Sequence, residues 1–477
     1  MTSDSPNSQA APTVPNTESR RTLYEAHKKI HPKSVTGIFT TWRWIFVWLT
    51  QAIFYGLCWV PWNGRQAVLF DVVQRKFYMF GLVFWPQDVF YLAVLLIISA
   101  YALFLFTAVA GRLWCGYACP QTVYTEIFMW IEKMIEGDRN ARIKLDLAPM
   151  SGGKLGKRVL KHGSWILFSL WTSFTFVGYF TPIKELWAEA QTLSFGPWEW
   201  LWIGLYGLFT YAFAGHLREQ VCKYMCPYAR FQGVMFDPDT LIITYDPERG
   251  EPRGKRSKSV DYKAKGLGDC VDCDLCVAVC PVGIDIRKGL QYECIGCAAC
   301  IDVCDEVMGK MGYPKGLIRY TTENALAKHW APKDILGHVA RPRTMLYSGI
   351  LAAITLGLIW GIAHKPRLRV DVIRDRGALC REAVGGMIEN PFRLHVMNVT
   401  EQPHKYSFAV SGLKGIQLLE APPLELSAAS NRDMTVEVRI PPTSGKLGSN
   451  PIYFDVKALD DPSISVHEKA AFMKCEL

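Results

Sequence analysis

Cysteine is the residue type in this sequence whose spacing points most directly to chemistry. Of the 15 cysteines, eight fall between Cys270 and Cys304. They form two runs with the same spacing, C-x-x-C-x-x-C-x-x-x-C, and Pro281 follows the first run. In two-cluster iron–sulfur proteins with this spacing, three cysteines of a run hold one 4Fe–4S cluster and the fourth holds the other. The pattern therefore predicts a segment that passes single electrons.

The ligand sets follow from this exchange of the fourth cysteines. We expect one cluster on Cys270, Cys273, Cys276 and Cys304, and the other on Cys294, Cys297, Cys300 and Cys280. Asp305 stands where the first run has Pro281, a departure that involves no ligand. Structural zinc also uses C-x-x-C pairs, but two matched runs of four cysteines favour iron–sulfur clusters.

Two further cysteine pairs form an internal repeat. Each follows an apolar run and ends in proline: Cys115-Gly-Tyr-Ala-Cys119-Pro120 and Cys222-Lys-Tyr-Met-Cys226-Pro227. Residues four apart share a helix face, so we expect each thiol pair to point one way. Four converging thiols would suit Cu(I), zinc or another iron–sulfur cluster, because thiolates are soft ligands. The alternative is that these cysteines are only small buried side chains near helix ends. The occurrence of two such motifs in the same register disfavours that alternative.

The remaining cysteines carry weaker signals. Cys58 lies inside an apolar run without a partner in sequence, so we expect a core residue. Cys380 and Cys475 lie near the two ends of the last segment, and in an oxidising compartment they could form a disulfide, although the sequence does not show that they meet. No G-x-G-x-x-G follows an expected strand, so the sequence offers no nicotinamide or flavin site.

Five apolar runs must position these cysteines, at about residues 44–61, 89–110, 163–181, 198–215 and 345–363. Each is close to the roughly 20 residues that cross a membrane as a helix. The 16 Trp, 24 Phe and 20 Tyr fit a membrane as well, because aromatic rings gather at its interfaces. The runs predict a multi-domain integral membrane protein with a five-helix membrane domain.

Lysine and arginine set the expected orientation. The tail before the first run has six, the 111–162 loop nine and the 216–344 segment nineteen, against three in the 62–88 loop and one in the 182–197 loop. Basic loops stay in the cytoplasm, so the 365–477 segment is expected on the outer side. This topology explains the net charge of +9 without a nucleic-acid partner. Beside the runs, we expect Lys154, Lys157, Arg158 and Lys161 to contact anionic lipid headgroups.

The expected domains follow the same order along the chain. They are a disordered cytoplasmic tail (1–40), a four-span membrane domain with the first C-x-x-x-C-P motif (41–217), the second such motif with a linker (218–260), a two-cluster ferredoxin domain (261–312), a cytoplasmic linker (313–343), a fifth span (344–364) and an outer β-sandwich (365–477). The sandwich rests on four alternating or β-branched segments at Phe392–Val399, Tyr406–Val410, Met434–Ile440 and Ile452–Val456.

Together these features resemble the cytochrome c oxidase accessory protein family, CcoG, also known as FixG or RdxA. The resemblance covers most of the chain from about residue 35. Besides the cysteine motifs it rests on Trp114-Cys115, on Glu136-Gly-Asp-Arg-Asn140 and on Val372-Ile-Arg-Asp-Arg376, which opens an immunoglobulin-like domain. It implies a bacterial inner-membrane protein that assists assembly of cbb3-type oxidase by reducing Cu(II) to Cu(I). It does not settle the copper ligands, which we place at Cys115, Cys119, Cys222 and Cys226, where a third redox centre is the alternative.

Three functions are therefore weighed. The first is a membrane cupric reductase, whose partners would be membrane lipids, oxidase subunits or copper-delivery proteins, and an electron donor that no motif identifies. The second is an electron-transfer subunit that delivers electrons to quinone or to a partner reductase. The third is a scaffold whose clusters only shape the fold. A homodimer is compatible with each of them.

Overall fold

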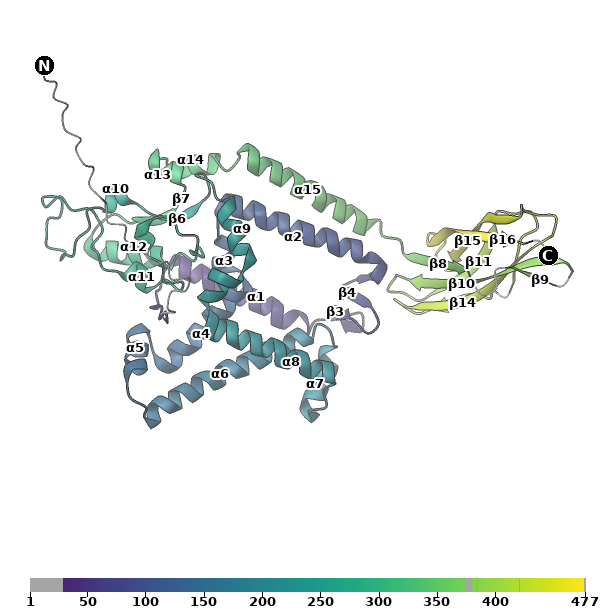
Figure 1. Cartoon of the computed structure of the whole chain (residues 1–477), viewed down its shortest axis with the longest axis horizontal. Helices are drawn as coiled ribbons and strands as arrows, with labels where there is room; N and C mark the ends of the chain where they lie inside the picture. Colours follow the sequence, from purple (N-terminus) through teal and green to yellow (C-terminus); the bar gives the residue numbers. More distant parts are fainter. Residues whose placement is uncertain (1–28, 375–379, 384, 420, 476–477) are drawn as a thin grey trace, which may run out of the picture.

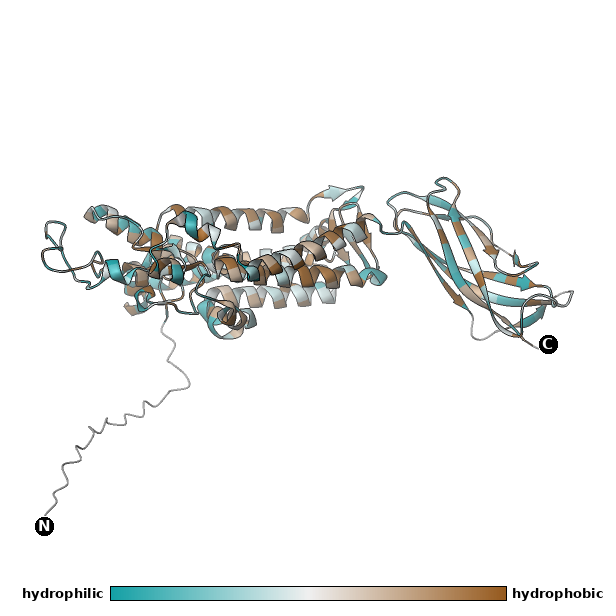
Figure 2. Ribbon diagram, turned by 90° about the horizontal axis from the view of Figure 1, so that it is seen from above, coloured by the Kyte–Doolittle hydropathy of each residue, from teal (hydrophilic) through white to brown (hydrophobic). Residues whose placement is uncertain are grey.

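The computed structural model describes residues 29–374, 380–383, 385–419 and 421–475, so most of the expected 1–40 tail lies outside the described residues. Three parts follow one another along the long axis: a small α/β unit, a set of long helices and a β-sandwich (Figure 1). The long helices are largely apolar, whereas hydrophilic residues are frequent at both ends (Figure 2).

Each of the five apolar runs forms a helix. These helices are α1 (Ile38–Leu57), α2 (Val89–Ala110), α6 (Gly152–Val177), α8 (Pro197–Thr210) and α15 (Pro342–Ala363). Among the described residues, two helical segments are long and apolar enough to cross a membrane, Pro86–Ala110 and Pro342–Ala363. Of the others, α6 begins in a basic segment, and α8 has only 14 residues before the chain continues as the π-helix η2 (Tyr211–Leu217). The five-span arrangement therefore stays a prediction.

The connections gather at two opposite ends of the helices. One end holds β1 (Pro61–Trp62), β2 (Arg65–Gln66), β3 (Val68–Asp71), β4 (Lys76–Met79), β5 (Leu82–Phe84) and α7 (Ile183–Thr192). The Gln66 side chain joins these segments by donating to the Gly178 carbonyl at 2.8 Å and accepting from the Ile183 N–H at 3.0 Å. The other end holds α3 (Leu113–Tyr117), α4 (Pro120–Glu136), α5 (Arg139–Leu147) and the α/β unit (Figure 1). Segments that share a charge bias in the sequence thus share an end of the molecule.

The C-terminal part is a sandwich of two antiparallel sheets, as the alternating sequence predicts. One sheet has the order β12-β14-β10-β8, with β9 also paired to β10, and the other has the order β13-β11-β15-β16. The strands are β8 (Leu368–Arg374), β9 (Arg381–Ala383), β10 (Met387–Asn398), β11 (His404–Ser411), β12 (Gln417–Leu419), β13 (Leu424–Leu426), β14 (Asn431–Ile440), β15 (Gly448–Ala458) and β16 (Ser465–Lys474). Inward residues such as Phe392, Val436 and Phe454 are fully buried between the sheets.

The sandwich rests on the small sheet β3-β4-β5, which lies in a segment that the sequence predicts to be a loop. Met397 of β10 is buried against Leu69 and Tyr78 of that sheet. Beside this contact, the buried Asp88 carboxylate lies 2.7 Å from Lys365 Nζ and 2.6 Å from an Arg369 guanidinium nitrogen. These contacts attach the sandwich to the start of α2 and the end of α15.

Two paired strands enclose the α/β unit. Strand β6 (Ile242–Tyr245) pairs antiparallel with β7 (Ile318–Thr321), and Ile243 and Ile318 lie in the core of the unit. Between them lie α10 (Pro247–Gly250), α11 (Leu275–Ala278), η4 (Ile286–Lys288) and α12 (Ala299–Met311), while η3 (Val221–Met225), α9 (Pro227–Met235), α13 (Glu323–Ala327) and α14 (Pro332–Gly337) flank the unit. The boundaries expected at 261 and 312 omit this strand pair, whose two halves are far apart in sequence.

A buried ionic cluster replaces part of the expected lipid surface. The carboxylate of Glu132 lies 3.1 Å from Arg142 and 2.9 Å from Arg218, and Glu136 lies 2.9 Å from Lys161. Lys161 is only 2% exposed. The lipid contact expected for Lys161 is therefore wrong, because acidic partners on α4 hold this side chain in the interior.

Candidate iron–sulfur sites and their neighbours

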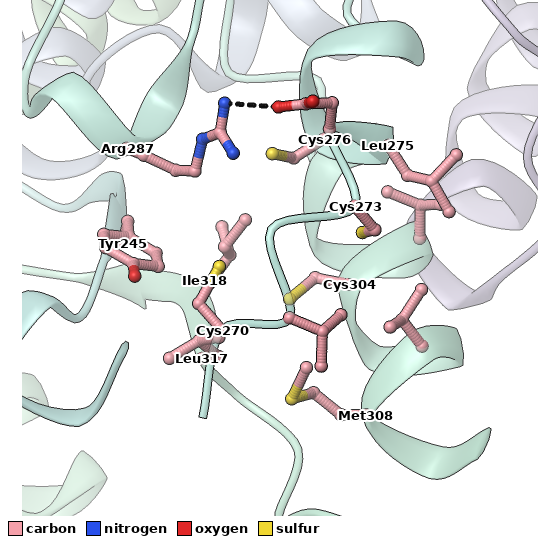
Figure 3. Close-up of a pocket in the computed structure, with 14 residues that line it drawn as sticks. Tyr245, Cys270, Cys273, Leu275, Cys276, Arg287, Cys304, Met308, Leu317 and Ile318 are labelled. Carbon is pink, nitrogen blue, oxygen red and sulfur yellow. Dashed lines mark hydrogen bonds and ion pairs between the residues drawn. The ribbon is translucent and has the colours of Figure 1, made fainter. Parts of the chain in front are cut away.

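The first cysteine quartet lines one pocket of the α/β unit. Cys270 and Cys273 lie on the loop before α11, Cys276 lies on α11, and Cys304 comes from α12. Figure 3 shows the four cysteine side chains around it, with Arg287 near Cys276 and Tyr245 on the side of Cys270. The structure thus gathers the four residues that the spacing assigns to one cluster.

The second quartet lines a neighbouring pocket. Cys280, Cys294, Cys297 and Cys300 surround it together with apolar residues such as Val282 and Ile295. Cys276 of the first quartet also borders this pocket, so the two pockets adjoin. A short distance between two such sites is what single-electron transfer between them requires.

The backbone folds the two cysteine runs in the same way. Asp272 and Asp274 have φ angles of 49° and 56°, and Gly296 and Ala298, at the equivalent places in the second run, have 69° and 59°. Left-handed residues are uncommon outside glycine. Because these residues stand at matched positions, both loops curve around their pockets in the same way. Two loops of the same shape are suited to hold two groups of the same kind.

The donor set of each pocket fits a 4Fe–4S cluster. Four cysteines of one predicted quartet line each pocket, and a 4Fe–4S cluster takes four thiolates. Burial raises the pKa of Cys276, Cys294 and Cys304 to about 12, so these thiols are protonated without a metal and loading a cluster must release protons.

The two C-x-x-x-C-P motifs do not each lie on one continuous helix face. Cys115 lies on α3, the chain then turns, and Cys119 is the N-cap of α4 with Pro120 as its first residue. Cys222 lies in the π-helix η3, and Cys226 is the N-cap of α9. The expectation of a shared helix face is wrong because proline removes a backbone donor and starts a new helix. The repeat itself persists in the structure.

These four thiols lie in one neighbourhood. Burial, followed by the nearby Cys119, Cys115 and Cys226, raises the pKa of Cys222 to about 12. Burial and then Cys119 raise the pKa of Cys115 to about 11. The set is half-buried, rich in sulfur and at the end of the helices, but its thiols do not stand ready around a single ion.

The first of these motifs packs directly on the second cluster pocket. A Cβ built on Gly116 would lie 2.7 Å from the Gly296 carbonyl oxygen and 3.0 Å from the Cys297 Cα. Cys115 and Cys222 also pack against the apolar shell of that pocket. The C-x-x-x-C-P thiols are therefore next to one end of the two-pocket series. The sequence does not predict this contact, although Gly116 inside the motif is a signal for it.

Comparisons with known proteins match these parts of the molecule. A family described as "4Fe-4S dicluster domain" matches residues 217–323, and one described as "4Fe-4S binding domain" matches residues 92–136, which include the first C-x-x-x-C-P motif. The family of the immunoglobulin-like fold at the C-terminus of FixG matches residues 358–474.

Curated relatives match most of the chain. The nitrogen fixation protein FixG of Rhizobium meliloti is 39% identical over 84% of this chain and 83% of its own length. Proteins RdxA and RdxB of Cereibacter sphaeroides are each 38% identical, over 83% and 90% of this chain and 85% and 91% of their own lengths. The chain belongs to the FixG/RdxA family. It is accordingly a membrane-associated iron–sulfur protein of electron transfer, with a ferredoxin-type unit and an immunoglobulin-like domain.

Two aspartates, one inside the second cysteine run and one directly after it, have structural roles in this FixG-family protein. Asp302 accepts hydrogen bonds from the backbone N–H groups of Phe39 and Thr40, at 3.2 and 2.7 Å, and thereby caps α1. Asp305, which replaces proline, accepts from the Gly316 N–H at 2.9 Å. Asp302 thereby attaches the ferredoxin-type unit to the first long helix, and Asp305 fixes the turn that precedes β7. The spacing of the cysteines gave no signal for either role.

The other cysteines behave largely as expected. Cys58 is 1% exposed and packs with Phe174 and Ile203. Cys380 and Cys475 are neighbours, since the Cys475 N–H lies 3.2 Å from the Cys380 sulfur, and both are free thiols in this structure. A disulfide between them stays a prediction.

Proposed function

We propose that this FixG-family protein moves single electrons from the cytoplasm to the C-x-x-x-C-P thiols at the membrane, where Cu(II) is reduced to Cu(I) for cbb3-type oxidase. In this proposal Cys270, Cys273, Cys276 and Cys304 hold one 4Fe–4S cluster, and Cys280, Cys294, Cys297 and Cys300 hold the other. Such clusters supply one-electron transfer. Reduction of one Cu(II) consumes one electron, and soft thiolates favour the Cu(I) product.

The contact between Gly116 and the Gly296–Cys297 backbone is the observation that supports this proposal most directly. It places the thiol motif beside the second pocket, with no side chain between the two backbones. A hydrogen bond holds the Gly296 loop in place at this contact, since the Tyr320 hydroxyl donates to the Gly296 carbonyl at 2.7 Å. A rigid, close contact favours electron transfer from that pocket to the thiols.

The proposed setting is the bacterial inner membrane with five spanning helices. The ferredoxin-type unit would face the cytoplasm, and the sandwich would face the periplasm. The separation of basic and less basic segments to opposite ends of the helices supports this arrangement. Oxidase subunits would then contact the sandwich side, copper-delivery proteins would contact the opposite end, where the four thiols lie, and the protein would act as a cupric reductase.

A third iron–sulfur cluster on Cys115, Cys119, Cys222 and Cys226 is the second candidate for these thiols. The match of residues 92–136 to a 4Fe-4S binding domain favours it. Iron analysis separates the candidates, since two clusters give about eight iron atoms per chain and three give about twelve. With a third cluster, the final acceptor would be copper, a quinone or a partner reductase.

The test of the proposed function is anaerobic reduction of copper by the purified full chain. The reduced protein receives stoichiometric Cu(II), Cu(I) is captured by a chromogenic chelator, and the clusters are followed by their visible absorption. A variant with Ser at Cys115, Cys119, Cys222 and Cys226 is measured in parallel. We expect the wild type to form Cu(I) as its clusters are oxidised, and the variant to react at least tenfold more slowly.

Each other result has a definite meaning. Equal rates for the two proteins would remove the four thiols from the copper reaction. Absence of Cu(I) in the wild type, with clusters that remain reduced, would reject copper as the acceptor and favour a quinone or partner reductase. Cys58→Ser serves as the control for loss of a buried cysteine outside the motifs.

A further inference from the structure

We propose that electrons enter at the first cluster pocket, from an acidic one-electron carrier protein that docks on a lysine-bearing loop beside it. The lysine loop comprises residues 251–268 and exposes Lys255, Lys258, Lys263 and Lys265. This inference rests on the proposed electron-transfer function and adds the class of electron donor to it. Each encounter moves one electron, so the carrier is oxidised by one electron for each one-electron reduction of this protein.

The direction of transfer follows from the exposure of the cysteines. Cys273 of the first quartet is exposed, whereas the other seven cysteines of the two runs are buried or half-buried. The second pocket is instead covered by the C-x-x-x-C-P motif through Gly116. The first pocket is thus the one that a soluble partner can approach, and the second adjoins the membrane thiols.

The lysine loop is attached to the backbone of the first pocket. Arg256 donates to the Cys270 carbonyl at 3.1 Å and to the Gly268 carbonyl at 2.6 Å. Its guanidinium also lies 4.8 Å from the Tyr262 ring centre and 5.3 Å from the Tyr313 ring centre. These contacts hold the loop in a defined position against Cys270, so a partner bound to the loop is close to the pocket.

On this face the acidic residues are in ion pairs, whereas, within the described part of the chain, the lysines of the loop are not. The acidic residues nearest the pocket already have cationic partners, since Asp272 and Asp274 pair with Arg287 at 2.9 and 2.8 Å, and Asp269 pairs with Arg249 at 2.7 Å. The four lysines of the loop form no ion pair with any of the described residues. Unpaired cations around an exposed redox site attract an acidic protein and speed its association.

The position of the loop favours a soluble partner over a membrane. The segment between α10 and α11 forms the extreme end of the molecule, on the side away from α2 and α15 (Figure 1). The same end is hydrophilic (Figure 2). Lysines that contact anionic lipids would be expected beside the helices instead.

The test uses bacterial flavodoxin, an acidic one-electron carrier, with the full-length protein in detergent. The loop variant has Glu in place of Lys255, Lys258, Lys263 and Lys265. The control variant, with the same net charge, has Glu in place of Lys414, Lys446, Lys457 and Lys469, exposed lysines of the sandwich. Binding of oxidised flavodoxin is measured first, which needs no electron transfer. Cluster reduction by flavodoxin hydroquinone is then followed by stopped-flow absorption.

We expect the loop variant to lose about tenfold or more in affinity and in the second-order rate constant at roughly 0.01 M salt, where charges act over about 30 Å. The control variant should match the wild type, and high salt should reduce the difference. Photoreduced deazariboflavin, which is uncharged, should reduce all three proteins equally.

Three results would overturn the docking proposal. The first is wild-type binding and rates in the loop variant, and the second is the absence of salt-dependent flavodoxin binding by the wild type. The third is loss of binding to anionic phosphatidylglycerol vesicles in the loop variant with flavodoxin binding unchanged, which would make the loop a lipid contact. Failure of the proposed function gives a different result from failure of the docking proposal. In that case the wild-type clusters, after reduction by deazariboflavin, would transfer no electrons to Cu(II).

Discussion

At the scale of single residues, the absence of a side chain at Gly116 lets the first C-x-x-x-C-P motif contact the second cluster pocket. Gly116→Ala places a methyl group against the backbone of Gly296 and Cys297, which cannot move aside as a flexible side chain can. Overpacking of this kind costs about 1–3 kcal/mol or forces the segments apart. We expect normal cluster absorption but slower formation of Cu(I).

The matched control for this prediction is Gly309→Ala. Gly309 lies on α12, and a Cβ there would meet nothing within 4 Å. It should leave the rate unchanged and stabilise the helix by up to about 1 kcal/mol. Equal copper kinetics for Gly116→Ala and the wild type would show that this contact is not on the electron path.

The buried carboxylate of Glu132 gives a second prediction at the residue scale. Burial raises its pKa, but Arg218, Arg142 and Lys161 outweigh that effect and hold the pKa at about 2, against the ordinary 4.5. Because the folded pKa is the lower one, the ionised group stabilises the fold above about pH 4.5, and this contribution disappears as pH falls towards about 2. Glu132→Gln leaves three cations without their shared partner and should cost about 3–5 kcal/mol near neutral pH.

Thermal unfolding in detergent, measured near pH 7 and near pH 3, checks this sign. The difference between Glu132→Gln and the wild type should shrink at the lower pH. Glu185→Gln, at an exposed site on α7, should behave as the wild type at both values. A difference that is constant with pH would contradict the ion-pair explanation.

At the scale of elements, the capping of α1 by Asp302 joins the ferredoxin-type unit to the long helices. Asp302→Ala removes the acceptor for the first N–H groups of α1, and loss of such a cap costs about 1–2 kcal/mol. We expect hydrogen exchange at Phe39 and Thr40 to accelerate by roughly 5–30-fold. Exchange in the sandwich should not change, and uniform acceleration would indicate global destabilisation instead.

The elements also show what the sequence could and could not predict. The apolar runs predict all five long helices, and alternation predicts β10, β11, β14 and β15, because both patterns are local. The cysteine spacing groups the same quartets that the two pockets contain. The sequence missed the pairing of β6 with β7, the packing of Met397 on β3-β4-β5 and the Gly116 contact. Each joins segments that are distant in the chain, and no local period records such a contact.

Lys161 shows that ion pairs between segments distant in the chain are equally hard to predict from the sequence. A basic residue beside an apolar run favours a lipid contact, and only the position of Glu132 and Glu136 on α4 shows that it is buried. The helix break at Cys119 was readable in principle from Pro120, since proline at the first position of a helix marks a new start.

At the scale of the whole molecule, the connections between the long helices lie at two opposite ends. The sheet β3-β4-β5 packs on the sandwich through Met397, and Asp88 binds Lys365 and Arg369, so the 62–88 segment and the sandwich lie at the same end of the helices. The lysine loop lies at the opposite end (Figure 1). This arrangement is independent of the count of lysines and arginines.

Cysteine labelling tests both arguments at once. Val73→Cys, in an exposed turn between β3 and β4, and Lys446→Cys, before β15, should react with a membrane-impermeant maleimide in intact spheroplasts. Lys263→Cys, in the lysine loop, should react only after lysis, and the wild type gives the background from its own cysteines. Reaction of Val73→Cys without Lys446→Cys, or the reverse, would contradict the packing of the small sheet on the sandwich. Reaction of Lys263→Cys alone would keep that packing and invert the whole molecule, which would leave the lysine loop without access to a cytoplasmic carrier.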